Sequence, residues 1–120
     1  MDRKCKVLVV EDDEAILVAV GEYLKALKFE VESAGDGNEA LMMLELFEPD
    51  VIMLDLRMPG MDGIEFMNAY SGPIPIVVMS GWVDTVREKL PREPFAKIMK
   101  PAKMSEVAPI LRDAAASRVA

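Results

Sequence analysis

The stretch PDVIMLDLRMPG at residues 49–60 decides how this chain folds. Its centre, residues 51–54, is a continuous apolar run with proline on one side and proline and glycine on the other. A short bounded run of this kind predicts a strand that is buried on both faces, as in a parallel sheet covered by helices. Asp55 ends the run, and a carboxylate in that place is costly unless a neighbour compensates it. Two interpretations of Asp55 are open at this point: a cap for the following turn, or part of a ligand site at the carboxyl end of a strand.

Three further apolar runs also end in polar residues. The run at residues 7–10 is followed by Glu11 and Asp12. The run at 76–79 is followed by Ser80, and the run at 95–99 is followed by Lys100. Because the carboxyl ends of parallel strands meet at the same edge of a sheet, we expect carboxylates, a hydroxyl and an ammonium group to gather at that edge. The coincidence of polar groups at four strand ends favours the ligand site over the turn cap.

The composition bounds both the size and the chemistry of the protein. A chain of 120 residues is long enough for one domain with a core of its own. A formal net charge of -7 argues against nonspecific nucleic-acid binding. No apolar run approaches the about 20 residues of a membrane span, no signal peptide is evident, and a single Cys5 fits a reducing cytoplasm. Without histidine, zinc sites and histidine-dependent triads are excluded, so any metal must be a hard cation held by oxygen.

Strands and helices alternate along the rest of the chain. We expect helices from a cap at Asp13 to about Leu27, over about 38–47, over 62–70, over about 84–90, and after a cap at Ser105. The apolar stripe of the first helix consists of Ile16, Leu17, Val20, Leu24 and Leu27. Residues 29–34 alternate in polarity, which is typical of a half-buried edge strand. Five strands alternating with five helices predict an α/β fold, a doubly wound, mostly parallel sheet with right-handed crossovers.

The residues at the strand ends suggest phosphoryl chemistry. Glu11, Asp12 and Asp55 would bring repelling carboxylates together, which calls for a cation, and Mg²⁺ suits hard oxygen ligands plus water. A metal in that place could neutralise a phosphoryl group and orient it for in-line attack. Asp55 could act as the nucleophile and form an acyl phosphate. Lys100 would balance charge, and the Ser80 hydroxyl could donate to a phosphoryl oxygen.

Four motifs, in chain order, make the sequence similar to a known family. They are VVED at 9–12, PDVIMLDLRMPGMDG at 49–63, VVMSG at 77–81 and KP at 100–101. With these motifs the chain resembles the receiver domains of two-component response regulators over nearly its whole length. The resemblance implies a single receiver domain over residues 1–120, with a frayed tail at 117–120. It also implies a flavodoxin-like sheet of five parallel strands with five helices, and in this sequence the third and fourth helices are short.

The resemblance makes Asp55 the phosphoacceptor. It implies that Asp12 binds Mg²⁺ directly, that Glu11 beside it acts through water, and that the backbone carbonyl of Arg57 is a further metal ligand. The choice of Glu11 and Asp12 over Asp12 and Asp13 depends on register. The first strand ends at residue 10, and Asp13 is better used as the helix cap.

Two further positions carry over from the family. Ser80 holds the Ser/Thr position that senses the phosphoryl group, and Lys100 holds the lysine position. The family usually has a cis bond after this lysine, so we expect the cis form between Lys100 and Pro101. The residue three before the lysine is usually aromatic, but this chain has Lys97 there. An ammonium group should stay in water, so we expect Lys97 to point outward.

The resemblance also implies partners. A histidine kinase or a phosphotransfer protein would supply the phosphoryl group, and the phosphorylated domain would change its contact with a downstream protein. Such a domain is not an enzyme in its own right, because it catalyses only its own phosphorylation and dephosphorylation. We expect a cytoplasmic protein with neither a nucleic-acid nor a membrane partner.

Two other functions compete with an active receiver. A degenerate receiver would be a protein-binding module that is never phosphorylated, and it would have no need to keep the full set of acids, serine and lysine. An aspartate-nucleophile phosphatase would need a second acid two residues after the nucleophile, and that position holds Arg57. The intact set of residues therefore favours the active receiver.

Overall fold

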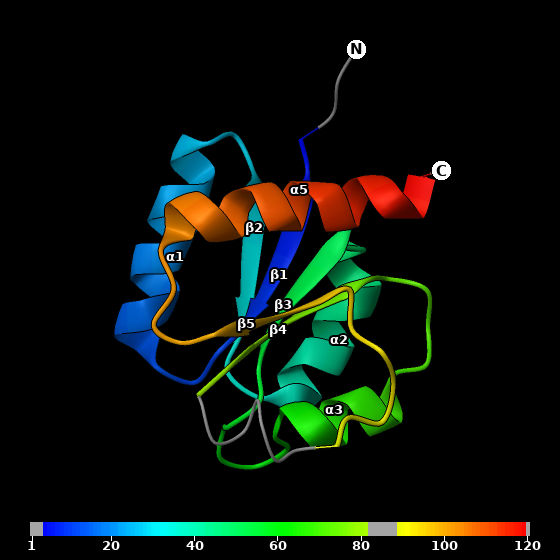
Figure 1. Cartoon of the computed structure of the whole chain (residues 1–120). Coiled ribbons are helices and arrows are strands. Elements are labelled where there is room, and N and C mark those ends of the chain that lie inside the picture. The colour runs from blue at the N-terminus through cyan, green and yellow to red at the C-terminus, as the bar shows by residue number, and fades with distance from the viewer. Residues whose placement is uncertain (1–3, 82–88, 120) are drawn as a thin grey trace.

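A sheet of five parallel strands runs through the middle of the computed structural model, which describes residues 4–81 and 89–119 (Figure 1). Its strands are β1 (Lys6–Val10), β2 (Glu30–Ala34), β3 (Val51–Asp55), β4 (Ile76–Ser80) and β5 (Ala96–Met99). They lie in the order β2-β1-β3-β4-β5, so β2 and β5 form the edges. This order is the doubly wound one of flavodoxin-like sheets. The predicted α/β fold, with an edge strand close to residues 29–34, is confirmed.

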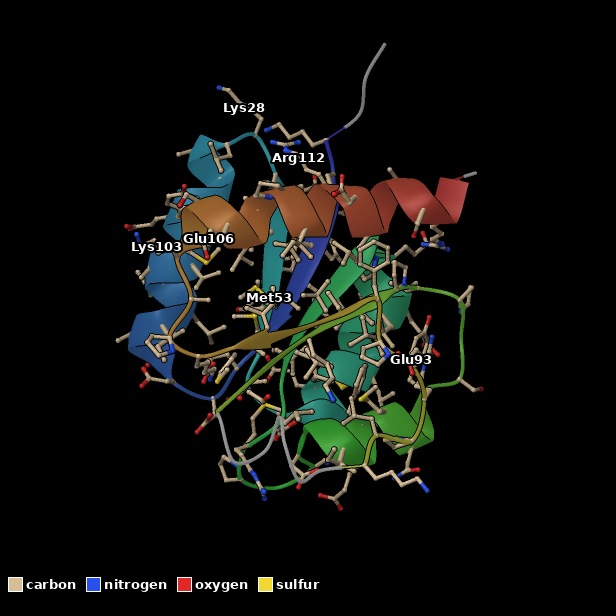
Figure 2. The ribbon with its side chains drawn as sticks, in the orientation of Figure 1. Lys28, Met53, Glu93, Lys103, Glu106 and Arg112 are labelled. Carbon is tan, nitrogen blue, oxygen red and sulfur yellow. The ribbon has the colours of Figure 1, made fainter. Side chains whose placement is uncertain are left out.

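Helices cover both faces of the sheet. In the described residues these are α1 (Glu14–Ala26) and α5 (Met104–Val119) on one face, and α2 (Gly37–Phe47) and α3 (Gly63–Ala69) on the other (Figure 1). Alternate strand residues supply the two cores: Met53, visible in Figure 2, packs under α1 and α5, whereas Leu54 packs under α2 and α3. A strand covered on both faces must be apolar throughout, which explains the continuous run in β3.

The strands that carry the polar groups end together. All residues of β3 and β4 are buried, whereas β5 alternates between half-buried and exposed residues. At the carboxyl edge the register pairs Val10 with Leu54, Asp55 with Met79, and Ser80 with Met99. The residues that follow β1 and β5 therefore reach the same edge as Asp55 and Ser80.

Aspartates cap the first three helices. The Oδ1 atom of Asp13 accepts two backbone N–H groups from the first turn of α1, at 2.9 and 3.2 Å. Asp36 caps α2, and Asp62 forms a reciprocal capping box with Glu65 at the start of α3. The predicted cap at Asp13 is confirmed, and α3 is short, as expected.

The start of α5 corrects one predicted cap. Ser105 is not the cap, because α5 already begins at Met104. The carbonyl of Lys103 accepts the first helical hydrogen bonds, at 2.9 and 3.1 Å, and Met104 packs against the core under α1 and α5. A serine cap contributes only about 1 kcal/mol, and the packing of Met104 in the first turn of α5 offers a gain of similar size.

The last helix, α5, continues into the segment 117–119. The frayed tail expected at 117–120 is helical as far as Val119. Arg118 donates a hydrogen bond to the carbonyl of Pro49 at 3.0 Å, which holds this end of the helix against the segment that leads into β3.

The apolar stripe of α1 is shorter than predicted. Val20 and Leu24 are buried and Leu17 is partly buried, but Ile16 and Leu27 are 39% and 38% exposed. Ile16 lines an open apolar hollow rather than the closed core, and Leu27 is the C-cap residue that follows the last helical turn. The periodicity of apolar residues identified the buried face of α1, but not where the buried stripe begins and ends.

The fourth helix expected at about 84–90 falls mostly on residues 82–88, which lie outside the described part of the chain. Lys89 and Leu90 are described, and they are not helical. Across residues 4–81 and 89–119, no helix combines the length and the hydropathy needed to cross a lipid bilayer.

Candidate functional site

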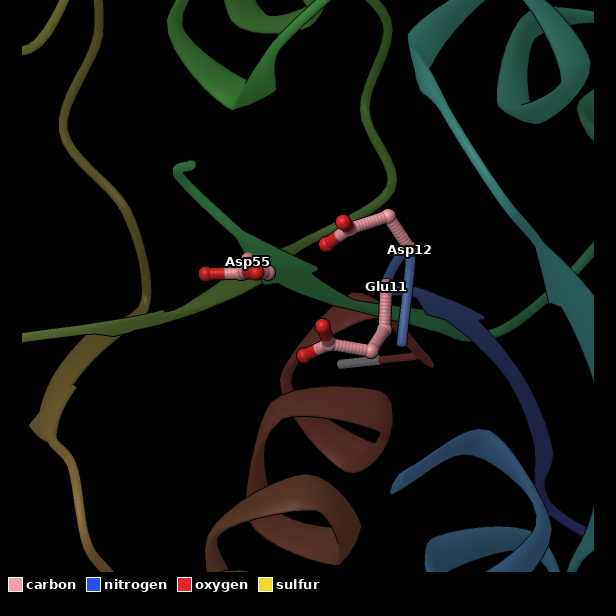
Figure 3. A group of neighbouring side chains, drawn as sticks. All are labelled: Glu11, Asp12 and Asp55. Carbon is pink, nitrogen blue, oxygen red and sulfur yellow. The ribbon is translucent and has the colours of Figure 1, made fainter. Parts of the chain in front are cut away.

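Three carboxylates meet at the carboxyl ends of β1 and β3. Glu11 and Asp12 directly follow β1, and Asp55 is the last residue of β3 (Figure 3). One carboxylate oxygen from each lies within 4.8 Å of the others. Glu11 and Asp55 are buried, each with 6% of its surface exposed, whereas Asp12 is exposed. The predicted acidic cluster is therefore present, with one side open to solvent.

The backbone holds the buried Glu11 in place. The N–H of Glu11 donates to the carbonyl of Ala34 in β2 at 3.0 Å, which extends the ladder one residue past β1. One carboxylate oxygen of Glu11 accepts the N–H of Asp13 at 3.2 Å. Asp13 thus caps α1 with its side chain and holds Glu11 with its backbone N–H. The second contact was not predicted from the sequence.

Lys100 is the cation of the site. Its Nζ lies 3.1 Å from Oδ1 of Asp55 and 3.3 Å from Oε2 of Glu11, so that it bridges the two buried carboxylates. Its backbone N–H donates to the carbonyl of Ser80 at 2.7 Å, which fixes the start of the segment after β5. The bond from Lys100 to Pro101 is cis, as expected.

Electrostatics within the site are strong because the groups are buried. Burial raises the pKa of Glu11, and the negative charge of Asp55 raises it further, against the opposing effects of the Asp13 N–H and the Lys100 ammonium. Burial alone would lower the pKa of Lys100. The hydrogen bonds and negative charges of Asp55 and Glu11 outweigh the effect of burial, so the pKa of Lys100 is raised. Lys100 therefore stays charged at neutral pH, and the carboxylates still repel one another.

The donor set suits a hard cation. Three carboxylates and one ammonium group leave the cluster with an excess of negative charge, which a divalent cation would offset. All the candidate ligands are oxygen atoms, the type that hard cations such as Mg²⁺ and Ca²⁺ prefer. The exposed side, at Asp12, leaves room for water molecules to complete a coordination shell.

The remaining predicted residues lie at the same edge. Ser80 ends β4 and is buried, with 1% of its surface exposed. The N–H of Arg57 lies 3.4 Å from Oδ1 of Asp55, so the loop after β3 curves back over the carboxylate, while the Arg57 side chain is exposed. Glu11, Asp12, Asp55 and Lys100 are thus in direct proximity, and Ser80 and Arg57 border them.

Gly63 is a residue of this site that sequence reasoning did not assign. A Cβ at Gly63 would lie only 2.5 Å from the carbonyl oxygen of Asp55, so the start of α3 rests directly on the backbone of the buried acid. Its N–H donates to the carbonyl of Leu56 at 3.1 Å. The signal in the sequence is a glycine placed immediately after the cap Asp62, where a helix would otherwise favour a residue with a side chain.

Comparison with known proteins identifies relatives that match most of the chain. Residues 7–112 match the family model of the response regulator receiver domain. The chain is 37% identical over 107 residues to the DNA-binding response regulator MtrA of Mycobacterium tuberculosis, with 85% of this chain and 46% of that protein covered. It is 33% identical over 111 residues to the transcriptional regulatory protein PdtaR of the same species, with 88% and 54% covered. The chain thus spans about half the length of these relatives.

Solved structures agree with the family match. The chemotaxis response regulator CheY4 of Vibrio cholerae superposes with a TM-score of 0.82 at 28% identity, covering 93% of this chain and 99% of that one. A CheY-like receiver domain from Methylobacillus flagellatus has a TM-score of 0.81 at 21% identity, covering 93% and 99%, and shows the same fold. The family match, the sequence relatives and the shared fold together show that this chain belongs to the response regulator receiver domain family.

Proposed function

We propose that this chain accepts a phosphoryl group on Asp55 from a histidine kinase or a phosphotransfer protein, in a Mg²⁺-dependent reaction. The observation that carries the proposal is the setting of the Asp55 carboxylate, which ends a fully buried strand and lies 3.1 Å from the Lys100 ammonium beside two further acids. A buried carboxylate with a fixed cation and an open side is suited to act as a nucleophile.

The proposed step is a transfer between two covalent bonds. A carboxylate oxygen of Asp55 attacks phosphorus, and the bond from phosphorus to the donor nitrogen breaks, with its electron pair leaving on the donor. The product is an acyl phosphate on Asp55. Lys100 would offset the charge of the carboxylate and of the phosphoryl oxygens, and the hydroxyl of Ser80, which ends β4 at the same edge, would donate a hydrogen bond to a phosphoryl oxygen.

The metal would be held by Glu11, Asp12, Asp55 and the backbone carbonyl of Arg57, with Glu11 acting through water. When bound, Mg²⁺ would neutralise the developing charge on the transferred group and orient it for in-line attack. Without a cation, the carboxylates repel an anionic phosphoryl donor. The oxygen-only donor set and its excess negative charge support this assignment.

We propose a signalling role rather than an independent enzymatic one. The domain would catalyse only its own phosphorylation and dephosphorylation, and the phosphorylated state would change a protein–protein contact surface. Two relatives are named as DNA-binding or transcriptional regulators, but this chain spans about half of their length. A formal net charge of -7 disfavours DNA contact by this domain, so we propose protein partners.

The test is to incubate the protein with Mg²⁺ and acetyl phosphate and to measure its intact mass. We expect a gain of one phosphoryl group, which is absent when EDTA replaces the Mg²⁺. No mass gain with acetyl phosphate and with a panel of phosphorylated histidine donors would favour the degenerate receiver, a phosphorylation-independent protein-binding module.

A further inference from the structure

The start of α2 holds the loop that leaves Asp55. Residues 56–62 carry the chain from β3 to α3 and include Arg57, whose carbonyl is a proposed metal ligand. The N–H of Gly37, the first residue of α2, donates a hydrogen bond to the carbonyl of Met61 at 2.8 Å. The first N–H groups of a helix have no partner within the helix, so this bond satisfies one of them and ties the loop to α2.

The contact depends on the missing side chain of Gly37. A Cβ there would lie 2.5 Å from Cγ and 2.7 Å from Sδ of Met61, far inside van der Waals contact. Met61 is partly buried and packs against the core under α2 and α3, so a methyl group on Gly37 would displace the Met61 side chain from that packing. Gly35, two residues earlier, is different: a Cβ there would meet only the Glu39 carboxylate, at 3.9 Å.

A second glycine brings the loop to α2. Gly60 has a φ of 72°, in the left-handed region that glycine adopts at little cost. A Cβ on Gly60 would be 3.6 Å from Oδ2 of Asp36, the residue that caps α2, so the turn of the loop lies against the cap. The end of the loop near Gly60 and Met61 is thus held against α2. The beginning of the loop is held by the N–H of Leu56, which donates to the carbonyl of Met79 in β4 at 3.3 Å.

We propose that Gly37 and Met61 form a positioning contact that sets the place of the Arg57 carbonyl relative to Asp55 and so determines Mg²⁺ affinity. The proposal rests on the proposed function, because it assigns the loop a role in metal binding. Groups that orient metal ligands typically change metal affinity by about tenfold or more when they are disturbed. Neither residue touches the phosphoryl group, so both act through the loop.

The experiment compares four variants of the full chain with the unmodified protein: Gly37→Ala, the matched control Gly35→Ala, Met61→Ala, and the double variant Gly37→Ala with Met61→Ala. The measurements are the Mg²⁺ Kd by titration calorimetry, the rate of phosphorylation by acetyl phosphate as a function of Mg²⁺ concentration, and unfolding in urea. We expect Gly37→Ala to raise the Kd about tenfold and to lower the rate at low Mg²⁺ more than at saturating Mg²⁺. We expect Gly35→Ala to stay within about twofold of the unmodified protein.

The double variant distinguishes positioning from a general loss of structure. Removing the Met61 side chain makes room for the new methyl group, so the double variant should return to the Kd of Met61→Ala, a strongly non-additive result. We expect Met61→Ala alone to raise the Kd, but by less than Gly37→Ala, because the hydrogen bond from the Gly37 N–H to the Met61 carbonyl remains. A Gly37→Ala Kd equal to that of Gly35→Ala overturns the proposal, and so does a double variant whose Kd stays at the Gly37→Ala value. If Gly37→Ala does not fold, Met61→Ala alone decides, because an unchanged Kd in that variant contradicts a positioning role. If the unmodified protein binds no Mg²⁺, the proposed function is refuted as well. If it binds Mg²⁺ and all the variants bind it with the same Kd, only this inference is refuted.

Discussion

Strands β3 and β5 each deliver one charged residue to the same site, yet their surroundings differ. Asp55 ends β3 and Lys100 follows β5, and the two side chains meet at 3.1 Å. All five residues of β3 are buried, whereas β5 is an edge strand in which alternate residues are exposed. Leu54, just before Asp55, has no exposed surface, while Met99, just before Lys100, is 46% exposed.

The difference indicates that the positions of Asp55 and Lys100 are maintained by different parts of the structure. Asp55 is fixed by the core on both faces of its strand, so its position follows from folding itself. Lys100 reaches the site from a strand whose outer side chains face solvent. Lys97, three residues before Lys100, is one of these exposed residues, in agreement with the expectation that it points outward.

The largest expected effect comes from removing the nucleophile at the end of β3. Asp55→Asn should reduce phosphorylation by acetyl phosphate about a thousandfold or more, because the amide cannot attack phosphorus. Asp50→Asn is the matched control, since Asp50 is also buried but lies at the other end of β3, where its Oδ2 accepts the N–H of Lys6. Intact mass spectrometry after a time course measures both. Normal phosphorylation of Asp55→Asn would place the acceptor elsewhere.

The next largest effect is on stability, and it compares the residue before Asp55 with the residue before Lys100. Leu54→Ala should lower the free energy of unfolding by about 3 kcal/mol, because it leaves a cavity in a fully buried site. Met99→Ala should lower it by less than about 1 kcal/mol, since nearly half of that side chain is already in water. Urea unfolding followed by circular dichroism measures both values. Equal losses would show that β5 is as firmly embedded as β3.

A third prediction concerns the exposed acid after β1. Asp12→Asn should lower the phosphorylation rate about a hundredfold and weaken its dependence on Mg²⁺, because one charged ligand is lost. Asp113→Asn, an equivalent change of an exposed aspartate on α5, should leave both unchanged. The measurement is the initial rate over a range of Mg²⁺ concentrations. An Asp12→Asn protein with an unaltered Mg²⁺ profile would remove Asp12 from the metal site.

The smallest effect is expected on β5 at Lys97. Lys97→Ala should change the free energy of unfolding by no more than about 0.5 kcal/mol, because the side chain is exposed. Its phosphorylation rate should also match that of the unmodified protein. The same urea and mass measurements apply. A large loss of stability would mean that the lysine stem contributes packing to the edge strand, and the contrast between β3 and β5 would weaken.

Local patterns predicted the elements best where one physical cause dominated. The strand at 51–54 and the cap at Asp13 were both predicted correctly, because the apolar run and the capping residue are features of a short stretch of sequence. Ser105 failed as a cap, and Ile16 failed as a core residue. In both cases the outcome depended on which distant side chains were available for packing, which no local pattern contains.

For the buried strands, the sequence by itself determined which groups stand at the ends, because such a strand is apolar and the polar residue that ends its apolar run lies at the carboxyl edge of the sheet. Only the tertiary structure decided how those groups pair. Lys100 and Glu11 lie 89 residues apart in the chain, and they meet because the sheet order and register align the ends of β1, β3 and β5. The contact of Gly37 with Met61 is decided in the same way, since it depends on the close approach of a helix start and a loop that the sequence specifies only separately.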